Sequence, residues 1–143
     1  MKIKLITVII FFLVIAIVFV IIRPQISSYS DDNPMLDKVR VAFSQINPKY
    51  ADIPLREGSS AYTENKRVIT LCLKNPDTGQ YYDFNTIMYV ALHELGHVVS
   101  KTHGHNEEFK LNFSTLLRKA AELKIYNPRK EIPQTYCGVG PND

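Results

Sequence analysis

The chain has 143 residues, of which 17 are Lys or Arg and 14 are Asp or Glu, so its formal net charge is +3. Three of the basic residues, Lys2, Lys4 and Arg23, flank an apolar segment, and the rest of the chain is formally neutral. This balance excludes the basic surplus that is typical of nucleic-acid-binding proteins. The residues after position 32 are enough for one small domain.

The apolar segment lies at the N-terminus. Residues 3–22 are almost entirely Ile, Val, Phe and Leu, and as a helix they would cover about 30 Å, the thickness of a bilayer's hydrocarbon core. A cleaved signal peptide is the alternative, but its apolar region usually has about 7 to 15 residues and ends at a small-residue cleavage site. Ser27 and Ser28 are the only nearby candidates for such a site. We therefore expect a transmembrane anchor at residues 1–23 and a polar stalk at residues 24–32.

The flanking charges indicate an orientation for this anchor. Lys2, Lys4 and the amino terminus lie on one side, whereas Arg23 alone lies on the other and is soon followed by acidic residues. The positive-inside rule then favours a cytosolic N-terminus and a lumenal or external domain. The sequence therefore predicts a single-pass membrane protein.

Residues 33–143 show the pattern of a small domain with helices and strands. Capping residues and apolar steps of three and four predict helices at residues 33–46, at residues 84–100 and from Asn106 onward. Residues 67–73 form the clearest strand, and residues 80–83 could form a short return strand after a turn. These elements predict an α+β fold.

The helix expected at residues 84–100 contains His93-Glu94-Leu95-Gly96-His97. On a helix the two imidazoles lie one turn apart on the same face, as two ligands of one metal ion must. Glu94 beside them could take a proton from a metal-bound water. Two ordinary helix histidines would be the simpler interpretation, but all four histidines of the chain lie between positions 93 and 105. The motif therefore predicts a catalytic zinc site, and Gly96 predicts a close packing partner, because glycine destabilises a helix.

A catalytic zinc ion usually has three protein ligands, so a third ligand is needed. His105 follows the chain reversal expected at Gly104 and directly precedes a helix start, which favours it as the third ligand. His103 has a known six-residue spacing from His97, but that spacing requires a glycine where this chain has Ser100. His103 and, more remotely, Glu122 stay open as alternatives.

The sequence from His93 to His97, followed by Gly104-His105-Asn106-Glu107-Glu108-Phe109, resembles the minimal zincins of the SprT and WLM type. Residues 71–89 also resemble small membrane-anchored metallopeptidases encoded by large DNA viruses. The resemblance implies zinc bound by His93, His97 and His105, with Glu94 as the general base. It implies a minimal zincin domain at residues 33–143, in which a small sheet packs on the motif helix, and a host or virion membrane for the anchor.

These observations predict a membrane-anchored zinc endopeptidase that hydrolyses peptide bonds by a zinc-activated water, with Glu94 as general base and a protein or peptide as substrate. SprT-type proteins that act on DNA-bound proteins often carry a basic surface or a further zinc-binding region, and this chain has neither, so no nucleic-acid partner is expected. One alternative is a non-catalytic, zinc-stabilised interaction or assembly domain. Another is a metal-dependent hydrolase of a non-peptide amide.

Three further features carry weaker expectations. Cys72 and Cys137 could form a disulfide in an oxidising compartment or remain free thiols, because a sequence alone does not fix pairing. Tyr126 and Tyr136 are candidates for stabilising an oxyanion, although packing is the favoured role for a tyrosine in a chain with eight of them. The strand at residues 67–73 could bind an extended peptide by edge addition.

Overall fold

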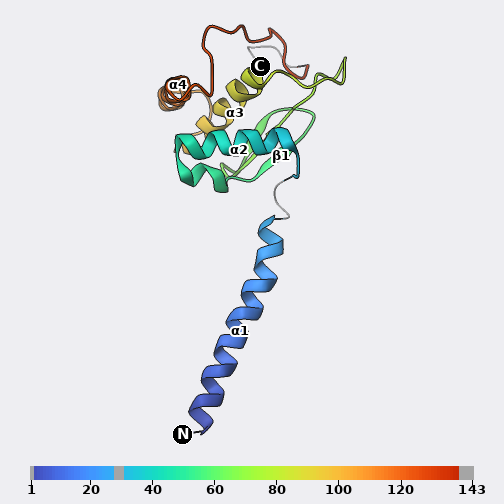
Figure 1. Cartoon of the computed structure of the whole chain (residues 1–143). Coiled ribbons are helices and arrows are strands. Elements are labelled where there is room, and N and C mark those ends of the chain that lie inside the picture. The colour runs from blue at the N-terminus through green and yellow to red at the C-terminus, as the bar shows by residue number, and fades with distance from the viewer. Residues whose placement is uncertain (1, 28–30, 139–143) are drawn as a thin grey trace. The chain divides into compact units, whose positions relative to one another are not determined.

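The computed structural model describes residues 2–27 and 31–138 (Figure 1). The chain divides into two units, Met1–Ser30 and Asp31–Asp143. The first unit contains one helix, α1 (Lys2–Ser27). Because α1 continues to Ser27, the first residues of the expected stalk are helical, while residues 28–30 of that stalk lie outside the described residues.

The expected membrane span requires correction. In the part of the chain that the structure describes, no helix has both the length and the apolar character needed to cross a membrane. The transmembrane helix in the expected fold class and the single-pass membrane localisation are therefore wrong.

The second unit begins with α2 (Pro34–Ile46), as the sequence predicts. The Asn33 side chain accepts a hydrogen bond from the Met35 amide at 2.8 Å, and proline at the first helical position lacks the N–H that would otherwise need a partner there. Leu36, Val39 and Phe43 are fully buried on one face. The short 3-10 helix η1 (Pro48–Asp52) follows directly.

A three-stranded sheet comes next, made of β1 (Leu55–Glu57), β2 (Tyr62–Glu64) and β3 (Val68–Leu71) in the order β1-β3-β2. The β1 strand pairs with β3 in parallel, and β2 pairs with β3 antiparallel. The central strand β3 is therefore hydrogen-bonded on both sides and cannot bind a peptide by edge addition. That expectation is wrong, and β2 is the outer strand on its side of the sheet. The expected return strand reduces to one bridge between Lys74 and Tyr81.

Two long helices complete the unit, and both begin where the sequence predicts. Asp83 caps α3 (Phe84–Val99) by accepting hydrogen bonds from the Asn85 and Thr86 amides. Asn106 caps α4 (Glu107–Glu122) by accepting one from the Phe109 amide. The α3 helix packs against α4 and the sheet, which gives the predicted α+β architecture (Figure 1). The buried core lies between these elements and includes the fully buried side chains of Leu71, Ile87, Met88, Leu92 and Leu95.

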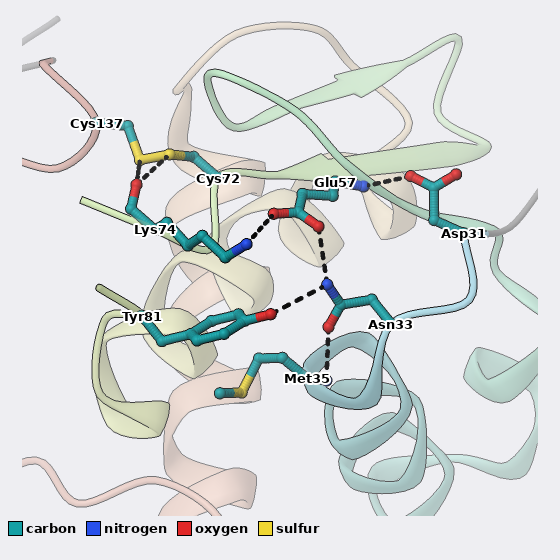
Figure 2. Close-up of polar contacts among 8 residues, drawn as sticks. All are labelled: Asp31, Asn33, Met35, Glu57, Cys72, Lys74, Tyr81 and Cys137. Atoms are coloured by element: carbon teal, nitrogen blue, oxygen red, sulfur yellow. Dashed lines mark hydrogen bonds and ion pairs between the residues drawn. A yellow bond between two sulfur atoms is a disulfide. The ribbon is translucent and has the colours of Figure 1, made fainter. Parts of the chain in front are cut away.

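Polar contacts hold the first residues of the second unit on the free side of β1 (Figure 2). The Asp31 amide donates to the Leu55 carbonyl at 3.0 Å, and the Glu57 amide donates to the Asp31 carboxylate at 2.7 Å. The Asn33 amide group also donates to the Glu57 carboxylate at 2.8 Å. The segment that leads into α2 is thus fixed to the sheet.

A disulfide between Cys72 and Cys137 fixes the C-terminal segment to the end of β3 (Figure 2). Beside it, the Tyr136 hydroxyl donates to the Cys72 carbonyl, and the Cys137 amide donates to the Tyr82 hydroxyl at 2.9 Å. Of the two possibilities for these cysteines, the structure therefore has the disulfide.

Candidate metal centre

Three imidazole rings meet beside the C-terminal half of α3. The Nε2 atom of His105 lies 3.0 Å from that of His93 and 3.1 Å from that of His97. His93 and His97 lie one helical turn apart on α3, whereas His105 comes from the loop before α4. Within the described residues, these three form the only group of histidine, cysteine or acidic side chains able to hold a metal ion together.

Of the candidate third ligands, only His105 belongs to this group of three. His105 reaches the pair on α3, and Gly104, with φ of +78°, provides the chain reversal that the sequence suggests. His103 lies at the border of the same cleft but outside the group of three, and Glu122 is exposed at the end of α4. The structure thus brings together the three histidines that the family resemblance implies.

Phe109, on the first turn of α4, holds the three rings in place. Its ring stacks on His97 with the centroids 4.3 Å apart, and it contacts the rings of His93 and His105 at 4.9 and 4.8 Å. A Cβ atom at Gly96 would lie 2.9 Å from the Phe109 ring. The expected close partner of Gly96 is therefore Phe109, and only glycine leaves room for this ring.

The environment favours the neutral form of the two imidazoles on α3. Burial, together with the neighbouring His97 and His105, lowers the pKa of His93 to about 4. Burial also lowers the pKa of His97, with further contributions from His105 and Lys66. A neutral imidazole has a free lone pair, which is the form that binds a metal ion.

These residues fit a zinc ion. Zinc binds histidine nitrogens at about 2.0–2.1 Å in tetrahedral geometry, which places two such nitrogens about 3.3 Å apart. The separations of 3.0 and 3.1 Å are close to that value. Three histidines are also the ligand set of one class of catalytic zinc site, in which the fourth position is left to water.

Glu94 lies beside the three histidines and is nearly buried, with 6% of its surface exposed. The Thr63 hydroxyl, on β2, lies 2.7 Å from the Glu94 carboxylate and 3.0 Å from the Glu94 carbonyl. Burial raises the pKa of the Glu94 carboxyl, and the Thr63 contact lowers it in part. A carboxyl group in this environment is suited to accept and release a proton.

A cleft of about 380 Å³ gives access to these groups. Its lining combines the motif residues with β2, the turn after it and the loop that carries His105: Ala61, Tyr62, Thr63, Asn65, Lys66, His93, Glu94, His97, Thr102, His103 and His105. Sequence reasoning missed Thr63 and Lys66. Their segment contains no regular apolar pattern, and the only local signal is Asn65, a residue that favours tight turns.

The two tyrosines that were candidates for oxyanion stabilisation have packing roles. Tyr126 is buried in the core beside Tyr89, with ring centroids 6.1 Å apart. Tyr136 packs on Tyr82, and its hydroxyl is engaged with the Cys72 carbonyl. Neither tyrosine is among the residues that line the cleft.

Comparison with known proteins gives viral relatives. Protein 136R of Invertebrate iridescent virus 6 is 39% identical over 89 residues, which are 61% of this chain and 50% of the relative. Protein 042R of Invertebrate iridescent virus 3 is 37% identical over 90 residues, or 63% and 57%. Protein R325 of Acanthamoeba polyphaga mimivirus is 31% identical over 120 residues, or 82% and 60%. The matched region thus spans between 50% and 60% of the length of these relatives, and all three are named as uncharacterized proteins.

No solved structure matches the chain significantly. The family model of the WLM domain matches residues 63–137. This range is more than half of the chain, and it contains Thr63, Glu94 and the three converging histidines. The chain therefore belongs to the WLM-domain family, which is zincin-like.

Proposed function

We propose that this protein is a zinc-dependent endopeptidase. The observation that carries the proposal is that three histidines converge at 3.0 and 3.1 Å beside the nearly buried carboxylate of Glu94 in one open cleft. A zinc site that only stabilises a fold is usually closed by four protein ligands and has no use for a neighbouring general base. The arrangement of three ligands and a carboxylate favours catalysis.

His93, His97 and His105 would hold the zinc ion. A bound zinc ion would lower the pKa of a coordinated water and polarise the substrate carbonyl. Glu94 accepts a proton from the attacking water and delivers it to the nitrogen of the leaving amine. The Thr63 hydroxyl keeps the Glu94 carboxylate in one orientation during this transfer.

We further propose that a peptide substrate lies along β2. Tyr62 and Thr63 of this outer strand line the cleft. An extended peptide can add to an outer strand through main-chain hydrogen bonds, which recognise the backbone rather than particular side chains. The substrate would then be an unfolded or extended segment of a protein.

The test compares the full chain with Glu94→Gln and His93→Ala, using a labelled denatured protein as substrate and metal analysis for zinc content. Glutamine has nearly the shape of glutamate but cannot act as a base, so Glu94→Gln should bind zinc normally and lose at least about 100-fold in cleavage rate. His93→Ala should lose both zinc and activity. Glu107→Gln, an exposed acidic residue of α4, is the control and should behave as wild type.

Two results would contradict the proposal. Wild-type cleavage by Glu94→Gln would show that Glu94 is not the base. If the wild type binds zinc and unfolds when it is removed, but cleaves no protein that Glu94→Gln leaves intact, the non-catalytic scaffold becomes the better interpretation.

A further inference from the structure

The turn between β2 and β3 has an unusual composition. Asn65 and Lys66 both have left-handed backbone conformations, with φ of +50° and +56°, and the Arg67 amide donates to the Glu64 carbonyl at 3.0 Å. Two left-handed residues between antiparallel strands are typical of a type I′ turn, in which glycine is preferred at the second position. A lysine there destabilises the turn relative to glycine, so its side chain calls for an explanation.

The Lys66 side chain is fully engaged next to the metal centre. Its ammonium group donates to the carbonyls of Ser100, Lys101 and Thr102, each at 2.7 Å. An ammonium has three N–H donors, so all of them are used. The acceptors are the residue that ends α3 and the first residues of the loop that carries His105, and a positive charge is favoured at the C-terminus of a helix.

A carboxylate holds the same loop through its N–H groups. Glu108, on the first turn of α4, accepts hydrogen bonds from the Lys101 amide at 2.8 Å, the Thr102 amide at 3.0 Å and the Thr102 hydroxyl. Lys66 thus binds the carbonyl groups of this segment and Glu108 binds its amides. Residues 101–105 form neither helix nor strand, so these two side chains set the path that leads to His105.

We propose that Lys66 is a positioning residue for the metal centre, whose ammonium fixes the loop so that the His105 ring meets those of His93 and His97. The inference rests on the proposed zinc site and extends it to a residue outside the motif. It explains why a lysine stands where the turn itself would prefer glycine. It also means that β2 and the turn after it contact the centre at two points, through Thr63 at Glu94 and through Lys66 at the loop.

The test measures zinc affinity by competition with a chelator, together with urea unfolding of the zinc-free protein. Lys66→Met keeps the aliphatic stem and removes the charge, and Lys66→Gly also relieves the turn. Side chains that orient metal ligands typically contribute about 10-fold to 100-fold to metal affinity, so both variants should bind zinc at least about 10-fold more weakly. Lys66→Gly should bind zinc more weakly even if its turn is more stable than that of the wild type.

Two controls separate positioning from general stability. Asn65→Gly changes the same turn but keeps the ammonium, and it should bind zinc as the wild type does. Lys130→Met removes a lysine that donates to Asp83 at the opposite end of α3, at 3.0 Å, and whatever its effect on the urea midpoint, it should not change zinc affinity.

The outcomes are distinct. Wild-type zinc affinity in Lys66→Met overturns the inference, and so does an equal loss of affinity in Lys130→Met, because the effect would then follow stability. If Lys66→Gly does not fold, Lys66→Met decides alone. Failure of the wild type to bind zinc would instead overturn the proposed function, so the two ideas fail on different measurements.

Discussion

At the scale of single residues, Thr63 lies outside the segment His93–His97 in the sequence but contacts Glu94 within it. The Thr63 hydroxyl has one hydrogen to donate and lies 2.7 Å from the carboxylate and 3.0 Å from the carbonyl of Glu94. The carboxylate is the shorter contact and the stronger acceptor. Thr63 therefore restricts the rotation of the Glu94 side chain, which in the proposed mechanism points at the attacking water.

Thr63→Val should lower kcat by about 10-fold to 100-fold, because a hydrogen bond to a charged group contributes about 1.5–3 kcal/mol and about 1.4 kcal/mol is a factor of ten in rate. Valine has nearly the same shape but cannot donate. Zinc content and KM should stay close to wild type, since neither a ligand nor the proposed substrate backbone contacts change. Thr63→Ser, which keeps the hydroxyl, is the matched control. Steady-state kinetics on one cleaved protein would decide, and an unchanged kcat in Thr63→Val would contradict this role.

At the scale of elements, the packing of α4 on α3 depends on the missing side chain at Gly96. The Phe109 ring fills the space where a Cβ would lie and stacks on His97. Because the ring is confined by three imidazoles, it cannot move away without displacing them. The packing of α4 on α3 and the positions of the three imidazoles therefore depend on the same Phe109 ring.

Gly96→Ala should lower the free energy of unfolding by about 1 kcal/mol. Alanine favours a helix over glycine by about 1 kcal/mol, but overpacking a tight contact costs about 1–3 kcal/mol. In a Phe109→Leu background the space is larger, so the same substitution should become neutral or stabilising. Urea unfolding of the four proteins would measure the difference. An equal cost in both backgrounds would show that Phe109 is not what excludes the methyl group.

The loop between these helices should also respond to acid through Glu108. Its hydrogen bonds with the Thr102 hydroxyl and with the Lys101 and Thr102 amides hold the pKa of the Glu108 carboxyl at about 2, below its ordinary value of 4.5. Because this pKa is lowered in the folded state, the charged carboxylate stabilises the fold above about pH 4.5, and this stabilisation is lost as the pH falls towards about 2.

Glu108→Gln should therefore be less stable than the wild type at pH 7, and the difference should shrink as the pH falls from about 4.5 towards about 2. Urea midpoints measured across that range would test this. Glu107→Gln is the matched control, because it removes the same charge from the first turn of α4 but only an exposed ion pair with Lys110. A difference that does not depend on pH would refute the assignment.

The elements also show what the sequence could predict. The starts of α2, α3 and α4 could be predicted, because capping is decided by neighbouring residues, and the caps are Asn33, Asp83 and Asn106. The strands β1 and β2 could not be predicted, because each has three residues and forms only by pairing with β3. The residues of the candidate metal centre show the same contrast. His93 and His97 could be predicted because helical spacing brings them together, whereas Thr63 and Lys66 lie beside them only because the sheet forms.

At the scale of the whole second unit, its first and last described segments are both fixed to the sheet. Asp31 bonds to β1, and Cys137 is linked to the residue that follows β3 (Figure 2). The loop that carries His105 instead depends on the side chains of Lys66 and Glu108. The two ends of the second unit are therefore held by the sheet, whereas the geometry of the loop at residues 101–105 is set by individual side chains.

Loss of the disulfide should test how far the stability of the second unit depends on the C-terminal segment. The cysteines are 65 residues apart, and closing a loop of that length stabilises a fold by roughly 4 kcal/mol in the chain-entropy model, with measured values often lower. Cys137→Ser should therefore lower the free energy of unfolding by about 2–4 kcal/mol. It should also change the near-ultraviolet circular dichroism, because Tyr136 would leave its contact with Tyr82. Cys72→Ser should give the same loss, and a reductant should destabilise the wild type but neither variant. If a reductant leaves the unfolding of the wild type unchanged, the link contributes nothing to stability.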